Sequence, residues 1–448
     1  MASNQLPPRN SAPDQPAASG PPAAQPADRR PGLDRRAFLR RAGLVTGGVA
    51  VGGVAGTLAE RAVADPQPPG SATRNANPLG GAAEASTSGS PIAFYGQHQA
   101  GVTDRAPAQL RFLAFDLTPA GRTGAAVIAK TLARLSAAAA SMMAGSWLPE
   151  QGSVADNLAP AGLTITFGFG AGLVRAAGKA VPAALAPLPE FAGDVLDPAR
   201  SGGDLAIQIC AGDPLLVSSV ARALVVLARG PLALRWSQSG FLPTAAASRD
   251  ADATPRNLMG QLDGTDNPTG SRLEIAVWLP QQAASPAWMA GGTYLVTRRI
   301  RMLLDSWEQQ PRATKEQVIG RSLSSGAPLS GGEEHTAPEF TARNDTGGLA
   351  IAADAHVRLA HPANNAGATM LRRGYSFDDG LRSDGQPDAG LFFQAFQVDP
   401  GQVFTPIQRR LAASDALRRF IRHESSAVFA IPPGATKGGW VGETLLHG

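Results

Sequence analysis

The pattern of hydrophobic and polar positions changes near residue 91. Before that point Pro, Ala and Gly are frequent, and after it apolar residues recur with the periods of strands and helices. In the first part of this body, short apolar runs bounded by turn residues predict strands at 111–117, 162–168, 204–211 and 232–240. Apolar residues spaced i, i+3 and i+4 predict helices at 124–144, 171–185 and 213–229.

The second part of the body repeats these kinds of pattern. Strands are predicted at 273–279, 293–302, 370–376, 391–398 and 427–431, and helices at 303–310, 315–321 and 404–422. The order of elements in each part fits a ferredoxin-like unit with an antiparallel sheet. We therefore predict an α+β fold of two ferredoxin-like halves, 91–265 and 266–448, packed sheet to sheet with a ligand-binding crevice between them. No internal sequence repeat is visible, so the duplication rests on element order alone.

Three stretches precede this body. Residues 1–33 are rich in Pro, Ala and Gln without apolar periodicity, which predicts a disordered head. Residues 34–64 have the features of an export signal, described next, and 65–90 are typical of a flexible linker.

The export signal is indicated by three features in chain order. Arg35 and Arg36 are followed by Phe38-Leu39, then by a weakly apolar run at 42–59, and a small-x-small cleavage pattern ends at Ala64. This resembles a twin-arginine signal, which implies that the twin-arginine machinery exports the folded protein to the periplasm, the cell envelope or the exterior. A retained N-terminal anchor, or a basic tail before a buried helix, remain the alternatives.

The charge balance excludes one class of partner. The chain holds 40 Lys and Arg against 36 Asp and Glu, but residues 1–64 account for eight Arg and four acids, which leaves 32 of each sign in the rest. A neutral body has no global field that would attract phosphate backbones, so no nucleic-acid partner is expected. The single cysteine, Cys210, excludes an intrachain disulfide, a cysteine-based zinc site and a cysteine-ligated iron–sulfur cluster, and a buried position is expected for it.

Among the six histidines, His356 has the most informative surroundings. It lies in the segment 351–362, at the start of a short apolar stretch, where a lone histidine is either structural or a ligand. His361 follows five residues later, so the two would not share a helix face as an i, i+4 metal pair does.

A second dense polar stretch lies at 256–268, where Gly and Asp residues form a turn-rich loop. A connector between the halves is one interpretation. A calcium loop starting at Asp263 fails because its sixth position is Pro268, where glycine is needed. A phosphate loop fails because the Gly-Lys-Ser/Thr ending is absent from this stretch.

This stretch resembles the signature of dye-decolourising haem peroxidases. The resemblance rests on Gly260-x-x-Asp263-Gly264 between Arg256-Asn257 and Thr265-x-Asn267, together with further segments in the family's order. Those segments are 94–101, 291–302, 355–358, 371–376, 390–393, 420–423 and 430–434. They span residues 91–434, and the family's fold of two ferredoxin-like halves around one haem agrees with the predicted element order.

The resemblance implies one haem b per chain, with His356 as the proximal iron ligand. A carboxylate behind that imidazole would make it a stronger electron donor, and Asp399 is the candidate. Asp263 would lie on the distal side, where a carboxylate can move a proton between the two oxygens of peroxide. Arg372 matches the distal arginine that would stabilise the leaving oxygen, and Arg373 is the alternative.

Further cofactor contacts follow from the same resemblance. Arg299 matches a partner of the haem propionates, with Arg298 or Arg301 as alternatives because strand side chains alternate. Leu391 and Phe393 match the apolar distal wall, although they could equally be ordinary core residues. The signature residues Gly264 and Thr265 are also expected to contact the cofactor.

The resemblance implies a haem-dependent peroxidase that reduces H2O2 and oxidises a dye-like or phenolic donor. The export signal is similar to that of the family's secreted branch, which includes a deferrochelatase/peroxidase of iron uptake. The alternatives are therefore iron removal from haem in contact with iron-uptake components, a non-catalytic haem-binding protein, and a chlorite-dismutase-like lyase, against which Asp263 argues. Homo-oligomerisation is a further expectation. Large donors would need a surface relay, and the sequence does not choose one among its six Trp and three Tyr.

Overall fold

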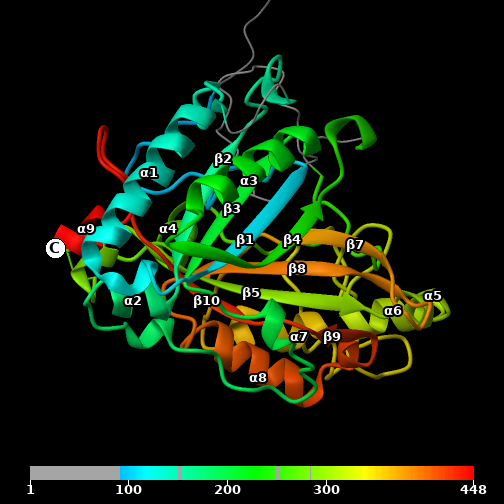
Figure 1. Ribbon diagram of the computed structural model, residues 1–448. Coiled ribbons are helices and arrows are strands. Elements are labelled where there is room, and N and C mark those ends of the chain that lie inside the picture. The colour runs from blue at the N-terminus through cyan, green and yellow to red at the C-terminus, as the bar shows by residue number, and fades with distance from the viewer. Residues whose placement is uncertain (1–90, 150–153, 249–252, 283, 448) are drawn as a thin grey trace, which may run out of the picture. The chain divides into compact units, whose positions relative to one another are not determined.

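The computed structural model describes residues 91–149, 154–248, 253–282 and 284–447 (Figure 1). The predicted head, export signal and linker lie outside these ranges. The described residues form an α+β fold around a ten-stranded antiparallel sheet.

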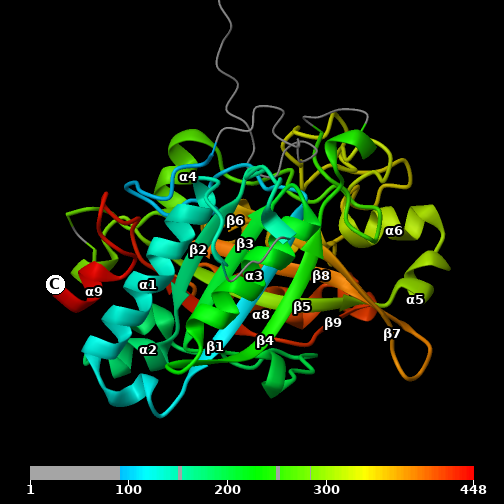
Figure 2. The same cartoon turned by 45° about the horizontal axis from the view of Figure 1, so that its top comes forward.

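The first half contains four strands and three helices. In chain order they are β1 Gln109–Leu117, α1 Ala125–Met143, β2 Thr164–Phe169, α2 Ala171–Ala176, β3 Leu205–Ala211, α3 Pro214–Ala228 and β4 Leu232–Phe241. The strands lie in the order β4-β1-β3-β2, and α1 and α3 cover one face of this sheet (Figure 2). The side chain of Asp213 caps α3 by accepting from the Leu216 N–H over 2.9 Å, as expected for an aspartate at this position.

The second half has more elements, and its longest helix, α8, lies on the side of the molecule away from α1 and α3 (Figure 1). In chain order they are α4 Gly270–Val277, β5 Thr293–Met302, α5 Leu304–Glu308, α6 Arg312–Ile319, α7 His356–Ala360, β6 Leu371–Arg372, β7 Tyr375–Leu381, β8 Pro387–Gln397, α8 Phe404–Ser414, β9 Ile421–His423, β10 Ala427–Ile431 and α9 Glu443–His447. Its four long strands lie in the order β10-β5-β8-β7.

Both halves therefore share one strand order, fourth-first-third-second, which is the ferredoxin-like arrangement predicted from element order. Two short pairings join them, Phe241 with Ser376 between β4 and β7, and Phe169 with Ala430 between β2 and β10. Because β5 also pairs with β8, these strands close into a barrel within the described part of the chain. Apolar side chains from both halves fill its interior, among them Phe112, Phe392, Phe396 and Phe429.

One predicted strand is a helix. The short apolar run 273–279 predicts a strand, but residues 270–277 form α4. Its apolar contacts come from Leu273, Ala276 and Val277, which are spaced i, i+3 and i+4, while Ile275 is 77% exposed. The stretch is helical because only the helical spacing places all the core-facing side chains on one face of the element.

Three other predicted elements are shorter than expected. The helix 171–185 ends at Ala176, and the strand 370–376 is divided between β6 and β7 by Arg373 and Gly374. The helix 404–422 ends at Ser414, because Asp415 closes α8 and then caps the 3₁₀ turn Ala416–Phe420 by accepting from the Leu417 N–H. This break places Asp415 in the candidate site described below.

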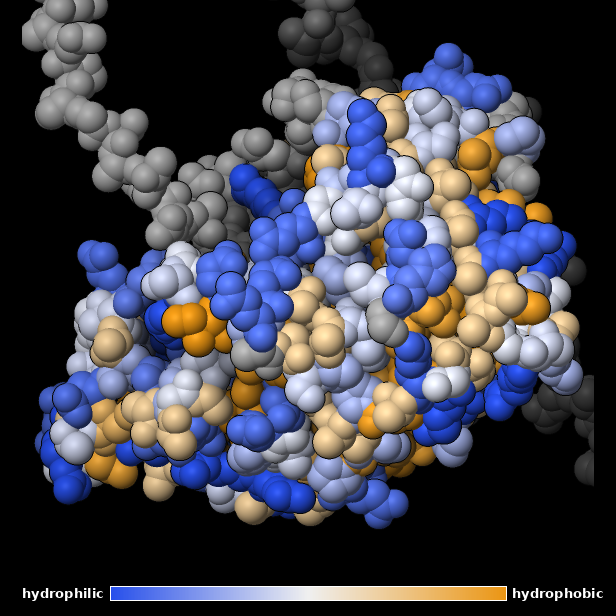
Figure 3. Space-filling model, turned by 90° about the vertical axis from the view of Figure 1, so that its left-hand side faces the viewer, coloured by the Kyte–Doolittle hydropathy of each residue, from blue (hydrophilic) through white to orange (hydrophobic). Residues whose placement is uncertain are grey.

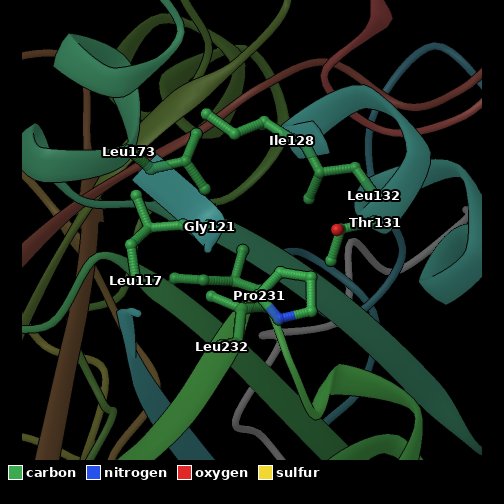
Figure 4. A pocket seen from close by; sticks show the side chains of 9 residues that line it. Leu117, Gly121, Ile128, Thr131, Leu132, Leu173, Pro231 and Leu232 are labelled. Carbon is green, nitrogen blue, oxygen red and sulfur yellow. The ribbon is translucent and has the colours of Figure 1, made fainter. Parts of the chain in front are cut away.

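The helices on the first half form an ordinary packed layer. By length and composition α1 could cross a membrane, but Leu132, Leu135 and Met142 pack it against the sheet. The apolar hollow beside α1, lined by Leu117, Ile128 and others, has a volume of only about 10 Å³ (Figure 4). That is room for about one water molecule, so this hollow is a packing gap. The face seen in Figure 3 carries hydrophobic residues in small groups among hydrophilic ones.

Candidate active site

His356 and Asp415 form a close pair beside the sheet of the second half. His356 begins α7, and its Nδ1 lies 2.6 Å from Oδ2 of Asp415, whose side chain is 3% exposed. The other oxygen of Asp415, Oδ1, accepts from the Leu417 N–H over 2.8 Å. The carboxylate is thus fixed from both sides, and Nε2 of His356 has no hydrogen bond within the described part of the chain.

The Asp415 carboxylate also affects the pKa of the His356 imidazole. Burial by itself lowers the pKa of His356. The negative charge of Asp415 and its hydrogen bond act in the opposite direction and together outweigh burial, so the pKa of His356 is raised overall. The predicted carboxylate, Asp399, was the wrong residue. Asp399 instead accepts from the N–H of Gly401 at 2.7 Å and from Gln402 within its own exposed loop.

The ring of His356 is partly accessible although protein surrounds it closely. A third of its side chain is exposed, yet burial is the strongest influence on its pKa. The exposed fraction and the strong effect of burial are compatible if the ring surface is accessible but many protein atoms separate it from bulk water. The charges of Arg372 and Asp263 also act on His356, so these three side chains lie around the same region.

Asp263 and Arg372 form a loose ion pair there. Oδ1 of Asp263 lies 3.4 Å from Nη1 of Arg372, and Nδ2 of Asn257 lies 3.3 Å from Oδ2. The two charged side chains are 24% and 31% exposed. Because both contacts are long, the carboxylate keeps capacity to accept a further hydrogen bond.

The loop that carries Asp263 is fixed by its own polar residues. The Asp263 N–H donates to the backbone O of Pro255 over 2.9 Å, and the Asn257 side chain accepts from the N–H groups of Met259 and Gln261. The guanidinium of Arg256 ties the loop to the backbone of 323–324 at 2.6 and 2.8 Å. The polar side chains of this stretch therefore fix the conformation of its backbone.

Arg372 is held by Asn267, a residue whose role the sequence did not indicate. Nδ2 of Asn267 donates to the backbone O of Arg372 over 2.8 Å, and its Oδ1 accepts from the Arg372 N–H over 3.0 Å. Arg373 points elsewhere, because its side chain is completely buried and donates to the backbone O of Asp104. Of the two neighbouring arginines, only Arg372 reaches Asp263.

Arg299 does not lie where the resemblance implied. On β5 it pairs with Phe392, so it faces the barrel interior, where it binds Glu424 and lies 3.0 and 2.8 Å from Asp379 and Asp388. Arg298, one of the two alternatives, pairs with Phe393 and therefore points to the other face of the sheet. Arg301 is on the same face as Arg299 and binds Glu424 at 2.7 Å.

Arg298 is the buried cation on the outer face. It is 1% exposed, its Nη2 lies 2.5 Å from Oδ1 of Asp194, and its Nε and Nη1 have no partner among the described atoms. His423 lies beside this pair, 3.8 Å from Asp194, and burial together with the charge of Arg298 lowers the pKa of His423 to about 3. The imidazole is therefore neutral at ordinary pH and adds no positive charge.

Leu391 and Phe393 line the same outer face. Each is only half buried, while Gly390, Phe392 and Gln394 between and beside them are buried. Phe393 packs near Phe404 of α8, so this wall lies between the sheet of the second half and its helices. The predicted crevice between the two halves is thus the wrong place, since that space is the filled barrel interior.

Gly264 and Thr265 support the loop of Asp263. Gly264 has a φ of +124°, which favours glycine, and its backbone O accepts from the Asn267 N–H. The hydroxyl of Thr265 donates to Oε1 of Glu334 over 2.9 Å. These contacts connect the Asp263 loop to Asn267 and to the segment near residue 334.

These residues fit the expected haem. A free imidazole nitrogen suits an iron, the half-buried Leu391 and Phe393 suit a flat apolar ring, and the unpartnered nitrogens of Arg298 suit a carboxylate. The Asp263–Arg372 pair provides an acid–base group and a fixed charge in the region of His356.

Comparisons with known proteins agree with this arrangement. Residues 99–242 match the family model "Dyp-type peroxidase, N-terminal", and residues 254–436 match "Dyp-type peroxidase, C-terminal". A dye-decolorizing peroxidase of Thermobifida fusca is 45% identical over 369 residues, with 78% of this chain and 84% of the relative covered. A deferrochelatase of Yersinia pseudotuberculosis is 33% identical over 369 residues, with 79% and 84% covered. The structure of ferric DtpA from Streptomyces lividans superimposes with a TM-score of 0.76 at 43% identity, over 80% of this chain and 98% of DtpA.

Proposed function

This chain belongs to the Dyp-type peroxidase family, and from that premise we propose which of its residues carry the reaction. It is a haem peroxidase that reduces hydrogen peroxide and oxidises an organic donor. We propose that Nε2 of His356 binds the iron, that Asp263 moves the peroxide proton, and that Arg372 stabilises the developing charge. The observation that carries this proposal is the pair of Asp263 and Arg372 in the same region as the free face of His356.

Asp263 and Arg372 have complementary tasks. When bound, haem would supply the iron and the two electrons that peroxide reduction needs. The Asp263 carboxylate would accept a proton from one peroxide oxygen and return it to the other oxygen, which leaves as water. The guanidinium of Arg372 orients the peroxide and stabilises negative charge on the leaving oxygen. Positioned proton transfer of this kind contributes about 10²–10⁴-fold to a rate.

His356 and Asp415 act from the other side. The Asp415 carboxylate accepts a hydrogen bond from the Nδ1–H of His356. This favours the tautomer in which Nε2 carries no proton and is free to bind a metal. A carboxylate behind an imidazole also increases its electron donation. Arg298 replaces Arg299 as the proposed partner of a haem propionate, because it lies on the same face as Phe393 and has unpartnered nitrogens.

An absorption spectrum of the haem-loaded protein tests the ligand. We expect His356→Ala to alter the Soret band and weaken haem retention. His361→Ala is the matched control, since His361 lies five residues further on and its Nδ1 accepts from the Ala363 N–H. A His356→Ala variant with the native Soret band and full haem content would show that another group binds the iron.

Deferrochelation is the second candidate, supported by the relative with that name at 33% identity. It would remove iron and leave the tetrapyrrole ring intact, so free protoporphyrin is its expected product. The proposed peroxidase instead oxidises a phenolic or dye-like donor only when peroxide is present. Fluorescence of protoporphyrin, measured beside donor oxidation on the same sample, separates the two activities.

Export by the twin-arginine machinery is also part of the proposal, and it rests on Arg35 and Arg36 followed by an apolar run. The mature protein would begin at Asp65 in the periplasm, cell envelope or exterior. Replacing both arginines with lysine is expected to keep the precursor inside the cell, and mass spectrometry of the exported protein would identify its first residue. Homo-oligomerisation and contact with iron-uptake components remain predictions.

A further inference from the structure

Arg373 carries a buried positive charge that the proposed reaction does not use. Its guanidinium is 0% exposed and lies inside the barrel. Nη1 donates to the backbone O of Asp104, while Nε and Nη2 have no partner among the described atoms. Within the described ranges, no Asp or Glu oxygen lies at ion-pair distance from it, and the Asp104 carboxylate accepts instead from the Gly101 N–H at 2.7 Å.

Three further polar side chains surround this guanidinium. Cys210 of β3 is in contact with Arg373, Tyr375 of β7 and Thr164 of β2, all of which influence its thiol. Thr164 and Cys210 are also direct partners across β2 and β3. The hydroxyls of Tyr375 and Thr164 are buried beside the Cys210 thiol and have no nitrogen or oxygen partner at hydrogen-bond geometry among the described atoms. The cluster thus brings together four donors that lack a nitrogen or oxygen partner, two from Arg373 in the β6–β7 turn and one each from Tyr375 and Thr164.

None of these neighbours supplies a negative charge. Burial raises the pKa of the Cys210 thiol, and burial raises the pKa of the Tyr375 phenol well above its ordinary value. Both groups are therefore neutral near pH 7. An uncompensated buried cation is strongly unfavourable, and structures normally pair such a charge with a counter-ion.

We propose that Arg373, Tyr375 and Thr164 form a binding site for a small monovalent anion of the halide class inside the barrel. Four converging donors match the coordination of a single small anion. The unpartnered Oε1 of nearby Gln394 is an acceptor and defines the competing outcome, in which water alone fills the site.

The position of this site links it to the peroxide side. The Arg373 N–H donates to the backbone O of Gln394 over 2.8 Å, and the preceding residue is Arg372. An anion that fixes the Arg373 side chain therefore fixes the turn between β6 and β7. The backbone of Arg372 is then held at both ends, by Asn267 and by the anion-bound neighbour.

Crystals of the haem-loaded wild-type protein soaked in bromide provide the direct test. Bromide scatters anomalously, so an occupied site gives an anomalous peak within hydrogen-bond distance of Nε or Nη2 of Arg373. We expect that peak. Density for water with no anomalous signal at this position would overturn the proposal, and this result needs no variant that might fail to fold.

Thermal unfolding provides the second test. At constant ionic strength, replacing gluconate with chloride is expected to raise the melting temperature by a few degrees and to saturate, because the anion binds the folded state only. Arg373→Met should abolish this rise. Arg321→Met is the matched control, since Arg321 is also buried but its Nη1 donates to the backbone O of Gly326 and Glu334.

The Soret band and the chloride responses of the two variants show whether the stabilisation comes from the proposed site. An unchanged Soret band across the chloride range excludes halide binding at the iron as the cause of the shift. Equal chloride responses in wild type, Arg373→Met and Arg321→Met would contradict the proposed site, because the stabilisation would then come from general salt effects.

Discussion

Asp415 ends helix α8 and holds Nδ1 of His356 at 2.6 Å from its carboxylate. The same carboxylate caps the following 3₁₀ turn, so helix geometry and ring orientation depend on one side chain. The proposed iron ligand is therefore oriented by the backbone of a neighbouring helix rather than by its own short helix.

Asp415→Asn should weaken haem binding by about 10–100-fold, the range for removing a carboxylate behind a metal-bound histidine. Asparagine can still cap the turn, so folding should be kept. Haem titration of the purified variant measures the affinity. Asp399→Asn is the matched control, because Asp399 bonds only within its own loop. Native affinity in Asp415→Asn would remove Asp415 from the proposed arrangement.

Asp263→Asn should lower kcat/KM for peroxide by about 10²–10⁴-fold while the haem spectrum stays native, since proton transfer is lost and the ligand is not. Steady-state kinetics with a phenolic donor measure this. Asp266→Asn serves as the comparison, because Asp266 is 41% exposed and faces His361 at 3.9 Å. A fall of similar size in both variants would indicate a change of loop shape rather than a lost proton carrier.

The fold could be predicted from the sequence because its strands and long helices follow their apolar periods. β5 and β10 begin and end as predicted, at 293–302 and 427–431. The prediction failed at α4, where eight residues fit both periods, and at Asp415, where a tertiary contact ends a helix that the pattern would continue. Local patterns contain no information about such contacts.

The candidate site also combines residues that sequence motifs indicate with residues that only tertiary contacts define. His356, Asp263 and Arg372 were found through motifs, and the structure brings them together. The choice among Arg298, Arg299 and Arg301 could not be made from the sequence, because only strand register decides which face of the sheet each arginine occupies. Asn267 belongs to the signature, but its role could not be predicted, since its two hydrogen bonds to the backbone of Arg372 join positions 105 residues apart.

Arg298 and Arg299 should respond differently to replacement by methionine. Arg298→Met is expected to lower haem affinity, because the unpartnered nitrogens on the cofactor side are removed. Arg299→Met leaves Asp379, Asp388 and Glu424 without their shared cation. It should destabilise the apoprotein by about 3 kcal/mol, the low end for breaking a buried pair, since the partners are partly exposed.

Urea unfolding and haem titration of both variants separate these effects. The expectation for Arg299→Met is a lower midpoint with near-native haem affinity in the folded fraction. The reverse assignment, with Arg299→Met selectively losing haem, would restore the original prediction from the family resemblance.

Cys210 should resist thiol reagents in the native protein. The thiolate is the reactive form, and burial raises the pKa of Cys210, so less thiolate exists at a given pH than in an unfolded chain. Reaction at pH 7–9 should be slow, and guanidinium should release one thiol per chain. Fast labelling without denaturant would show that the barrel interior opens readily.

Asn267 provides a test of how Arg372 is positioned. Its amide makes two hydrogen bonds to the backbone of Arg372, at 2.8 and 3.0 Å, and none to the side chains of Asp263 and Arg372 in the described part of the chain. Asn267→Ala should therefore lower kcat/KM for peroxide while haem content stays native. Combining it with Arg372→Leu should add little, because residues that act through one another are not additive. Asn364→Ala is the control, since Asn364 makes a similar 2.8 Å bond to the backbone O of Arg358. Fully additive losses in the double variant would mean that Asn267 acts on the reaction independently of Arg372.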